Sequence, residues 1–107
     1  MSKNMLGDLM RQAQQMQGKM KELQREAGNR VVEASSGGGM VTVRMNGRQE
    51  LLSLKVEQEL SDSEDLEMLQ DLIVAAVNEG IRKSKEVMEE EMKKLTGGLN
   101  FKIPGLF

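Results

Sequence analysis

Lysine and arginine side chains gather near the start of this 107-residue chain. Residues 1–30 hold six basic and three acidic side chains, although the whole chain, with 15 basic and 17 acidic residues, has a formal net charge of −2. Basic and amide side chains spaced along a helix suit contact with phosphate groups, which requires no aromatic residue. The candidate phosphate contacts are Arg11, Lys19, Lys21 and Arg25, with Lys3 and Arg30 as secondary candidates.

A second basic cluster, Arg82, Lys83 and Lys85, lies further along the chain and is also a secondary candidate. Both groups have a simpler explanation as well. The net charge is low for a nucleic-acid-binding protein, so the first group also fits a solvated helix face. In the second group Arg82 and Glu86 are spaced i,i+4, as are Lys85 and Glu89, which is typical of surface ion pairs on a helix.

The missing residue types exclude much chemistry. Without His or Cys the chain cannot build a Ser-His-Asp or Cys-His nucleophile, a zinc finger, or a haem or iron–sulfur site. Trp and Tyr are absent, and the two aromatic residues, Phe101 and Phe107, lie at the end, so the body of the protein cannot stack on bases. We expect no enzymatic activity, no cofactor, no metal and no small-molecule substrate.

Composition and the N-terminal residues also bear on cellular location. The absence of cysteine fits a reducing cytoplasm. Asp8 and Arg11 interrupt the N-terminus before a signal core could form, and the longest apolar run, 72–77, has six residues. Neither secretion nor a membrane span is indicated.

Two further patterns have simpler explanations than ligand binding. Gly37, Gly38 and Gly39 lie between two predicted strands, with no helix start after them, which favours a hairpin turn over a phosphate cradle. The acidic residues between 62 and 71 lack the spacing of a calcium loop, and they suit the positive dipole end of a helix.

The first basic residues should lie on a long helix. Apolar residues follow one another at alternating spacings of three and four from Leu6 to Ala27, which is a heptad seam, and Gly28-Asn29 can end the helix. Methionine in this seam suits core filling between two helices better than an adaptable client-binding surface. We predict that a dimer interface runs along it, formed by Leu6, Leu9, Ala13, Met16, Met20 and Leu23.

Three antiparallel strands are predicted in the middle of the chain. The first begins at Val31, the second spans 40–45 after the glycine turn, and the third spans 48–57. Asn46-Gly47 predicts a tight two-residue hairpin turn between the last two. Leu52, Leu54 and Val56 share one face of the third strand.

A long second helix should follow. Ser61-Asp62-Ser63-Glu64 predicts a capping box, apolar residues from Leu66 to Leu95 form one broad face, and Thr96-Gly97-Gly98 ends it. We therefore expect one α+β domain over residues 1–107, with flexible ends at 1–4 and 99–107.

The predicted helices are too long for a compact monomer. They should measure about 33 and 48 Å, whereas a globule of this length is only about 34 Å across. An elongated shape would leave the seam from Leu6 to Ala27 in water unless a second copy covered it, so we predict a twofold homodimer.

Taken together, the segments resemble the YbaB/EbfC family of bacterial nucleoid-associated proteins. The similar segments are 9–17 in the first helix, the glycine turn and hairpin over 37–47, 68–79 in the second helix, and Gly97-Gly98 with Pro104-Gly105 in the tail. Their order and spacing extend over nearly the whole chain. One departure is Gly80, where the family commonly has alanine.

The resemblance implies a cytoplasmic, nucleoid-associated homodimer that binds double-stranded DNA and influences chromosome organisation and gene expression. It also implies a tweezer-like dimer of α+β protomers, without a catalytic motif. The family's DNA contacts are attributed to basic helical positions, so the site residues above rest on charge placement in this chain.

Two alternative functions stay open from the sequence. Two long helices beside a hairpin, with many methionines, also suit a holdase chaperone of prefoldin-like outline. An adaptor dimer that binds another protein through the tail from Phe101 to Phe107 is the other alternative.

Overall fold

The computed structural model describes residues 3–96 as an elongated α+β chain measuring 75 × 24 × 18 Å. The N-terminal helix α1 (Lys3–Asn29) leads into a sheet of β1 (Val31–Ser36), β2 (Val41–Asn46) and β3 (Leu51–Val56). A short helix α2 (Gln58–Ser61) precedes the long helix α3 (Leu66–Thr96). The predicted fold class is confirmed. Helix α1 already includes residues 3 and 4, and the tail 99–107 lies outside the described residues.

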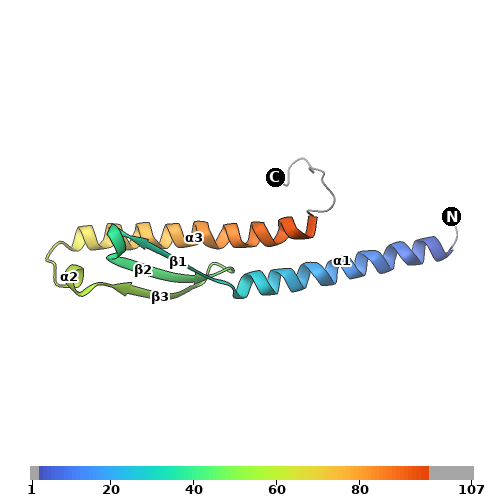
Figure 1. Ribbon diagram of the computed structural model, residues 1–107, viewed down its shortest axis with the longest axis horizontal. Coiled ribbons are helices and arrows are strands. Elements are labelled where there is room, and N and C mark those ends of the chain that lie inside the picture. Colours follow the sequence, from blue (N-terminus) through green and yellow to red (C-terminus); the bar gives the residue numbers. More distant parts are fainter. Residues whose placement is uncertain (1–2, 97–107) are drawn as a thin grey trace.

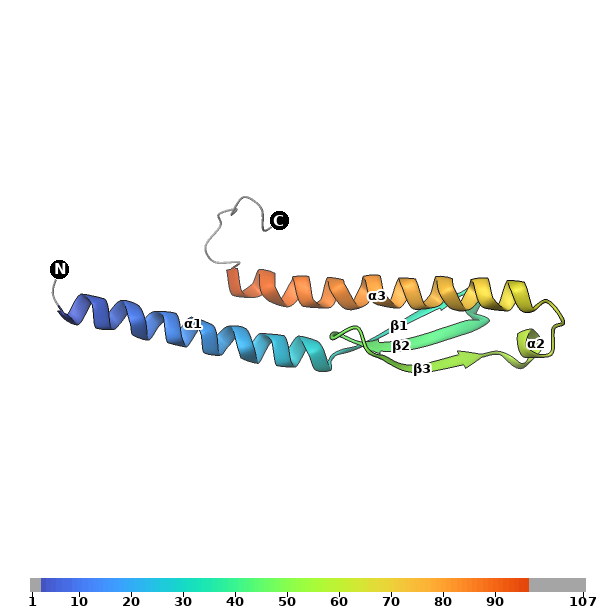
Figure 2. The same ribbon diagram turned by 180° about the vertical axis from the view of Figure 1, so that it is seen from behind.

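Helix α3 forms one layer, and α1 and the sheet follow one another in the other layer (Figures 1 and 2). Helix α3 packs over β1 and β2, and the C-terminal part of α3 lies beside the last turns of α1. The N-terminal half of α1 projects beyond the body of the molecule. No helix within residues 3–96 is long and apolar enough to cross a membrane.

The sheet is antiparallel in the order β1-β2-β3, and its register decides which side chains are buried. Val43 pairs with Ala34 on one side and with Leu54 on the other. Directly paired residues share a face, so the alternating Val41, Val43 and Met45 all turn toward α3. With Ala34, Leu60 and Ala76, the two valines form the buried core.

Gly80 allows α3 to lie close to the sheet. A Cβ atom at this position would lie 3.1 Å from Val43 Cγ2 and 3.4 Å from Met45 Cε. The absence of a side chain at Gly80 therefore coincides with tight packing of α3 on β2.

The predicted two-residue turn at Asn46-Gly47 is wrong, because residues 47–50 form a four-residue loop and β3 begins only at Leu51. Asn46 belongs to β2, and its Oδ1 accepts hydrogen bonds from the backbone amides of Arg48 and Glu50, at 2.9 and 3.1 Å. Positive φ occurs instead at Gln49. Gly47 is required for another reason, because a Cβ there would lie 1.9 Å from the carbonyl oxygen of Ala27.

The predicted capping box at Ser61 is also wrong. Ser61 lies inside α2, where its hydroxyl donates to the carbonyl of Gln58 at 2.9 Å. Asp65 caps α3 instead, because its Oδ1 accepts the backbone N–H of Met68 at 3.0 Å. The extra turn of α2 buries Leu60 and moves the start of the long helix to Leu66.

Large apolar side chains remain exposed in two places. Along α1, Leu6, Leu9 and Met16 expose 56, 52 and 44% of their surface. The second place is β3, where Leu51, Leu52 and Leu54 are all exposed. The pairing of β2 with β3 contains a bulge here, because Arg44 pairs with Ser53 whereas Met45 pairs with Leu51. Leu54 lies on the α3 side of the sheet, as its alternation predicts, but α3 covers β1 and β2 and leaves β3 open.

Candidate nucleic-acid interface

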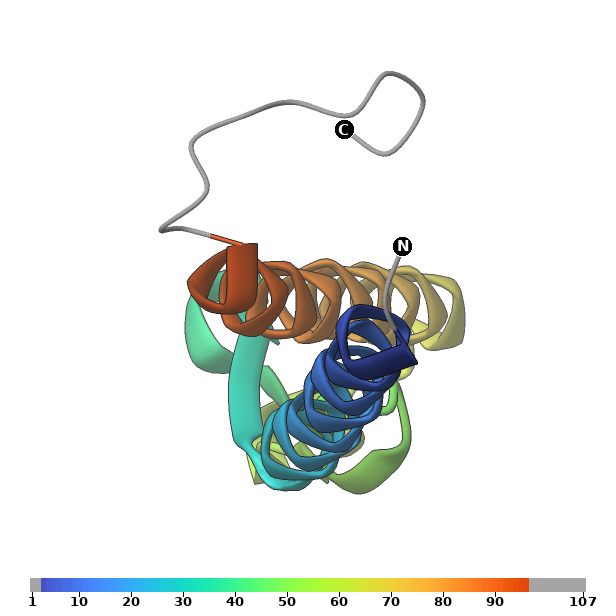
Figure 3. The ribbon, with the colours of Figure 1, turned by 90° about the vertical axis from the view of Figure 1, so that its right-hand side faces the viewer.

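The basic residues of α1 lie on a projecting helix that touches the body only at its C-terminal end. Leu23 is half-buried on the side toward α3, and Ala27 and Gly28 are buried. At about 100° per residue, Lys21 and Arg25 lie roughly 160–200° around the helix from Leu23, and so point away from α3. Figure 3 shows α1 end-on beneath α3. Both side chains are exposed, in keeping with their position opposite Leu23 on the helix.

The remaining α1 candidates differ in their surroundings. The Arg11 side chain is exposed, and its Nη1 lies 3.7 Å from Asp8 Oδ1, a surface ion pair of little energetic weight. Lys19 lies in a shallow groove between α1 and α3 that is also lined by Glu22, Glu26 and Lys94. Lys3 begins α1, and its side chain lies outside the described residues.

Arg30 contacts a carboxylate of α3, so part of its side chain already has a partner within the protein. Its Nη1 donates to Glu91 Oε1 at 3.1 Å, and Lys94 Nζ donates to the same oxygen at 3.1 Å. The hydrogen bond and charge of Lys94, followed by those of Arg30, hold the pKa of Glu91 below its ordinary value. This carboxylate was not recognised from the sequence, because its partner Arg30 is 61 residues away.

On α3, two of the three secondary candidates are engaged within the protein. Arg82 lies between Glu79 and Glu86, with its Nε 3.0 Å from Glu79 Oε2. The hydrogen bonds and charges of these carboxylates raise the pKa of Arg82, and Arg82 lowers that of Glu79. Lys83 Nζ donates to the backbone carbonyl of Glu33 on β1 at 2.8 Å.

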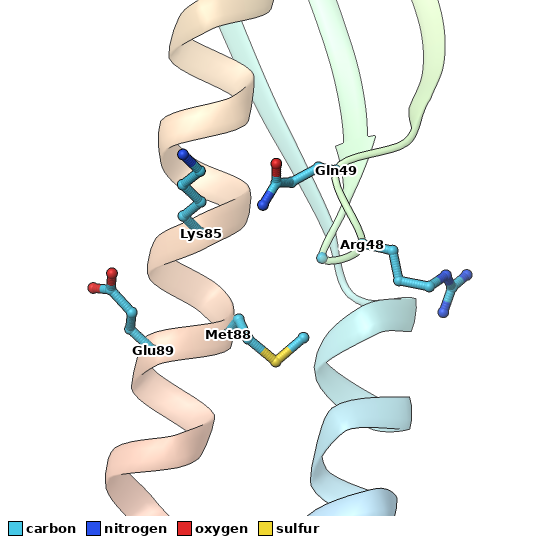
Figure 4. A pocket seen from close by; sticks show the side chains of 6 residues that line it. Arg48, Gln49, Lys85, Met88 and Glu89 are labelled. Atoms are coloured by element: carbon cyan, nitrogen blue, oxygen red, sulfur yellow. The ribbon is translucent and has the colours of Figure 1, made fainter. Parts of the chain in front are cut away.

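Lys85 lines a groove between α3 and the β2–β3 loop (Figure 4). Gln49 and Met88 point into the space between the two elements, whereas Arg48 points away from α3. Arg48 Nη1 donates to Asn29 Oδ1 and its Nε to Glu50 Oε1, each at 2.9 Å. The groove therefore does not bring two basic side chains together.

The sequence prediction missed basic residues on the sheet. Arg44 and Lys55 are exposed, and their pairing with Ser53 and Thr42 places them on the face opposite α3. The alternation of side chains along β2 could have revealed Arg44, because Val43 and Met45 point toward α3 and the residue between them must then point outward.

The described residues thus form a small α+β protein with a projecting basic helix. Comparison with known proteins identifies the class: the chain matches the model of the YbaB/EbfC DNA-binding family over residues 2–99, and it belongs to that family. The predicted resemblance is confirmed.

Related proteins agree with this assignment. The chain is 58% identical over 101 residues to a nucleoid-associated protein of Syntrophobacter fumaroxidans, covering 92% of each chain. It is 51% identical to a nucleoid-associated protein of Pelotomaculum thermopropionicum, covering 95% of each. An uncharacterised protein from Helicobacter pylori has a similar crystal structure, with a TM-score of 0.65, 30% identity, and coverage of 92% of this chain and 97% of that one.

Proposed function

We propose that this protein binds double-stranded DNA as a homodimer, mainly through contacts with backbone phosphates, and that it acts in chromosome organisation and gene regulation at the nucleoid. The observation that carries the proposal is the position of Lys21 and Arg25 on the exposed side of a projecting helix, within a DNA-binding family. Neither residue has a carboxylate partner within the described residues.

Phosphate contact suits this helix because it needs mobile, solvated cations rather than a shaped pocket. Arg11 extends the same surface along α1, whereas Lys19 lies on the side of α1 that faces α3 and is a weaker candidate. Among the α3 cations, Lys85 is the strongest secondary candidate, since Arg82 and Lys83 would first have to leave protein partners. Binding of this kind depends weakly on base sequence, so any preference should follow DNA shape and deformability.

A second copy would cover apolar surface that the monomer leaves in water. The predicted interface on α1 is Leu6, Leu9, Ala13, Met16, Met20 and Leu23, and all of these except half-buried Leu23 are exposed. The leucines of β3 are a second apolar surface, on a strand that pairs on one side only within residues 3–96. Such an edge is a ready template for pairing with another chain.

The test is a fluorescence-anisotropy titration of a labelled duplex of about 30 bp between 50 and 300 mM salt, with two unrelated sequences. Log affinity should fall with log salt at a slope of about −0.9 per phosphate contact. We expect Lys21→Ala/Arg25→Ala to weaken binding equally for both sequences and to make this slope shallower.

A matched control variant keeps the positive charge at both positions and changes the geometry of the side chains little. Lys21→Arg/Arg25→Lys preserves both positive charges, so it should retain most of the affinity and the salt dependence. No binding of the wild-type protein at 50 mM salt would refute the proposal. Suppression of client aggregation, or salt-resistant capture of a single protein partner, would then favour the chaperone or adaptor alternatives.

A further inference from the structure

We propose that the face of the sheet turned away from α3 is part of the DNA-contacting surface, with Arg44 and Lys55 binding backbone phosphates. This outer face consists of the side chains that alternate with the buried ones. They include Val31, Glu33 and Ser35 on β1, Thr42 and Arg44 on β2, and Ser53 and Lys55 on β3. The inference rests on the proposed DNA binding and adds a second element to it.

The register brings the two cations to neighbouring strands. Arg44 pairs with Ser53, and Lys55 pairs with Thr42, so the four side chains form one block across β2 and β3. Ser35 extends the block, because it pairs with Thr42 on the other side. Hydroxyl groups are common hydrogen-bond donors to phosphate, and their short side chains allow a backbone to approach the sheet.

Both cations are available to a ligand. Arg44 is exposed and has no ion pair within the part of the chain that the structure describes. Lys55 exposes 76% of its side chain and lies 3.8 Å from Glu57 Oε1, a loose surface contact of little energetic weight. Glu33 is the single carboxylate on this face among the three described strands, and it faces Arg44 without a salt bridge between them.

This face continues the exposed side of α1. Helix α1 and the sheet lie end to end on the same side of α3 (Figures 1 and 2), and Lys21 and Arg25 also point away from α3. The surface extends about 30 Å from Lys21 to Lys55. This length is the sum of the helical rise along the end of α1 and the strand rise along the sheet. That length is close to the roughly 34 Å of one duplex turn. A straight duplex can therefore contact both groups of cations while the acidic helix α3 faces away from it.

The experiment compares Arg44→Ala/Lys55→Ala with the wild type and with the single variant Arg44→Lys in the same duplex titration. Removing two phosphate contacts should weaken binding roughly tenfold at 200 mM salt and reduce the slope by about 1.8 for each bound protomer. Arg44→Lys keeps the charge and should bind nearly as well as the wild type. Circular dichroism and size-exclusion chromatography check folding and oligomeric state.

The outcomes separate this inference from the proposed function. If Arg44→Ala/Lys55→Ala binds like the wild type while Lys21→Ala/Arg25→Ala is weakened, the sheet face is not a contact surface and DNA binding by α1 stands. A shift in oligomeric state without a loss of affinity would assign the outer face to a second copy of the chain, and would overturn the inference. Failure of the wild type to bind any duplex overturns both.

Discussion

Arg30 donates a hydrogen bond of 3.1 Å to Glu91, which connects the junction of α1 and β1 to the last part of α3. The Glu91 side chain exposes only 9% of its surface, and Lys94 contacts the same oxygen. Two cations therefore hold one nearly buried carboxylate at the point where the projecting helix leaves the body. We infer that this contact helps to set the direction of α1, and with it the position of Lys21 and Arg25.

The Glu91 contact should make stability depend on pH. Its pKa is lowered in the folded protein, so its contribution is complete above the unfolded-state pKa of about 4.3 and is lost as the pH falls through the folded-state value. In urea denaturation, Glu91→Gln should be destabilised relative to the wild type at pH 7, and the difference should shrink toward pH 3. Glu90→Gln, an exposed neighbour with the same charge change, should follow the wild-type profile. Parallel profiles for Glu91→Gln and the wild type would contradict this role.

Gly47→Ala should destabilise the fold by about 1–3 kcal/mol, because the new methyl group would overlap the Ala27 carbonyl and force the backbone to move. Gly18→Ala is the matched control. Gly18 lies in α1, no atom lies within 4 Å of the place its new methyl group would occupy, and the change should stabilise the helix by about 1 kcal/mol. Thermal denaturation measures both. Equal melting temperatures for Gly47→Ala and the wild type would show that the loop can shift without cost.

Asp65→Ala should cost about 1 kcal/mol, the usual loss when a helix loses its N-cap side chain. Ser61→Ala removes only a hydroxyl that donates within α2, so it should change the free energy of unfolding by less. Urea denaturation of both variants distinguishes the observed cap from the one predicted by the sequence pattern. A larger loss for Ser61→Ala would favour Ser61 as the cap.

Two double variants test the proposed dimer. Leu9→Glu/Met16→Glu places charge in the α1 seam, and Leu52→Glu/Leu54→Glu places it on β3, in both cases at positions exposed in the protomer. If the second copy covers both surfaces, each variant should shift the protein toward monomer in analytical ultracentrifugation while circular dichroism stays unchanged. A variant that dimerises like the wild type removes its surface from the interface, and a monomeric wild type refutes the dimer.

Local patterns in the sequence were sufficient for much of the architecture. The heptad spacing from Leu6 predicted α1, the alternation of Val41, Val43 and Met45 predicted β2 and its buried face, and the apolar periodicity from Leu66 to Leu95 predicted α3. These signals are reliable because each depends on the period of one element, and the period is repeated several times within that element. The outward direction of Lys21 and Arg25 follows from the same periodicity.

Tertiary structure decided the features that depend on contacts between distant residues. Gly47 serves the approach of Ala27 rather than a two-residue turn, Glu91 is buried because Arg30 and Lys94 neutralise it, and Lys83 contacts the backbone of Glu33. The alignment of Arg44 and Lys55 with the exposed side of α1 also requires α1 and the sheet to lie on one side of α3. No local period encodes these relationships, because they arise only when segments tens of residues apart pack together.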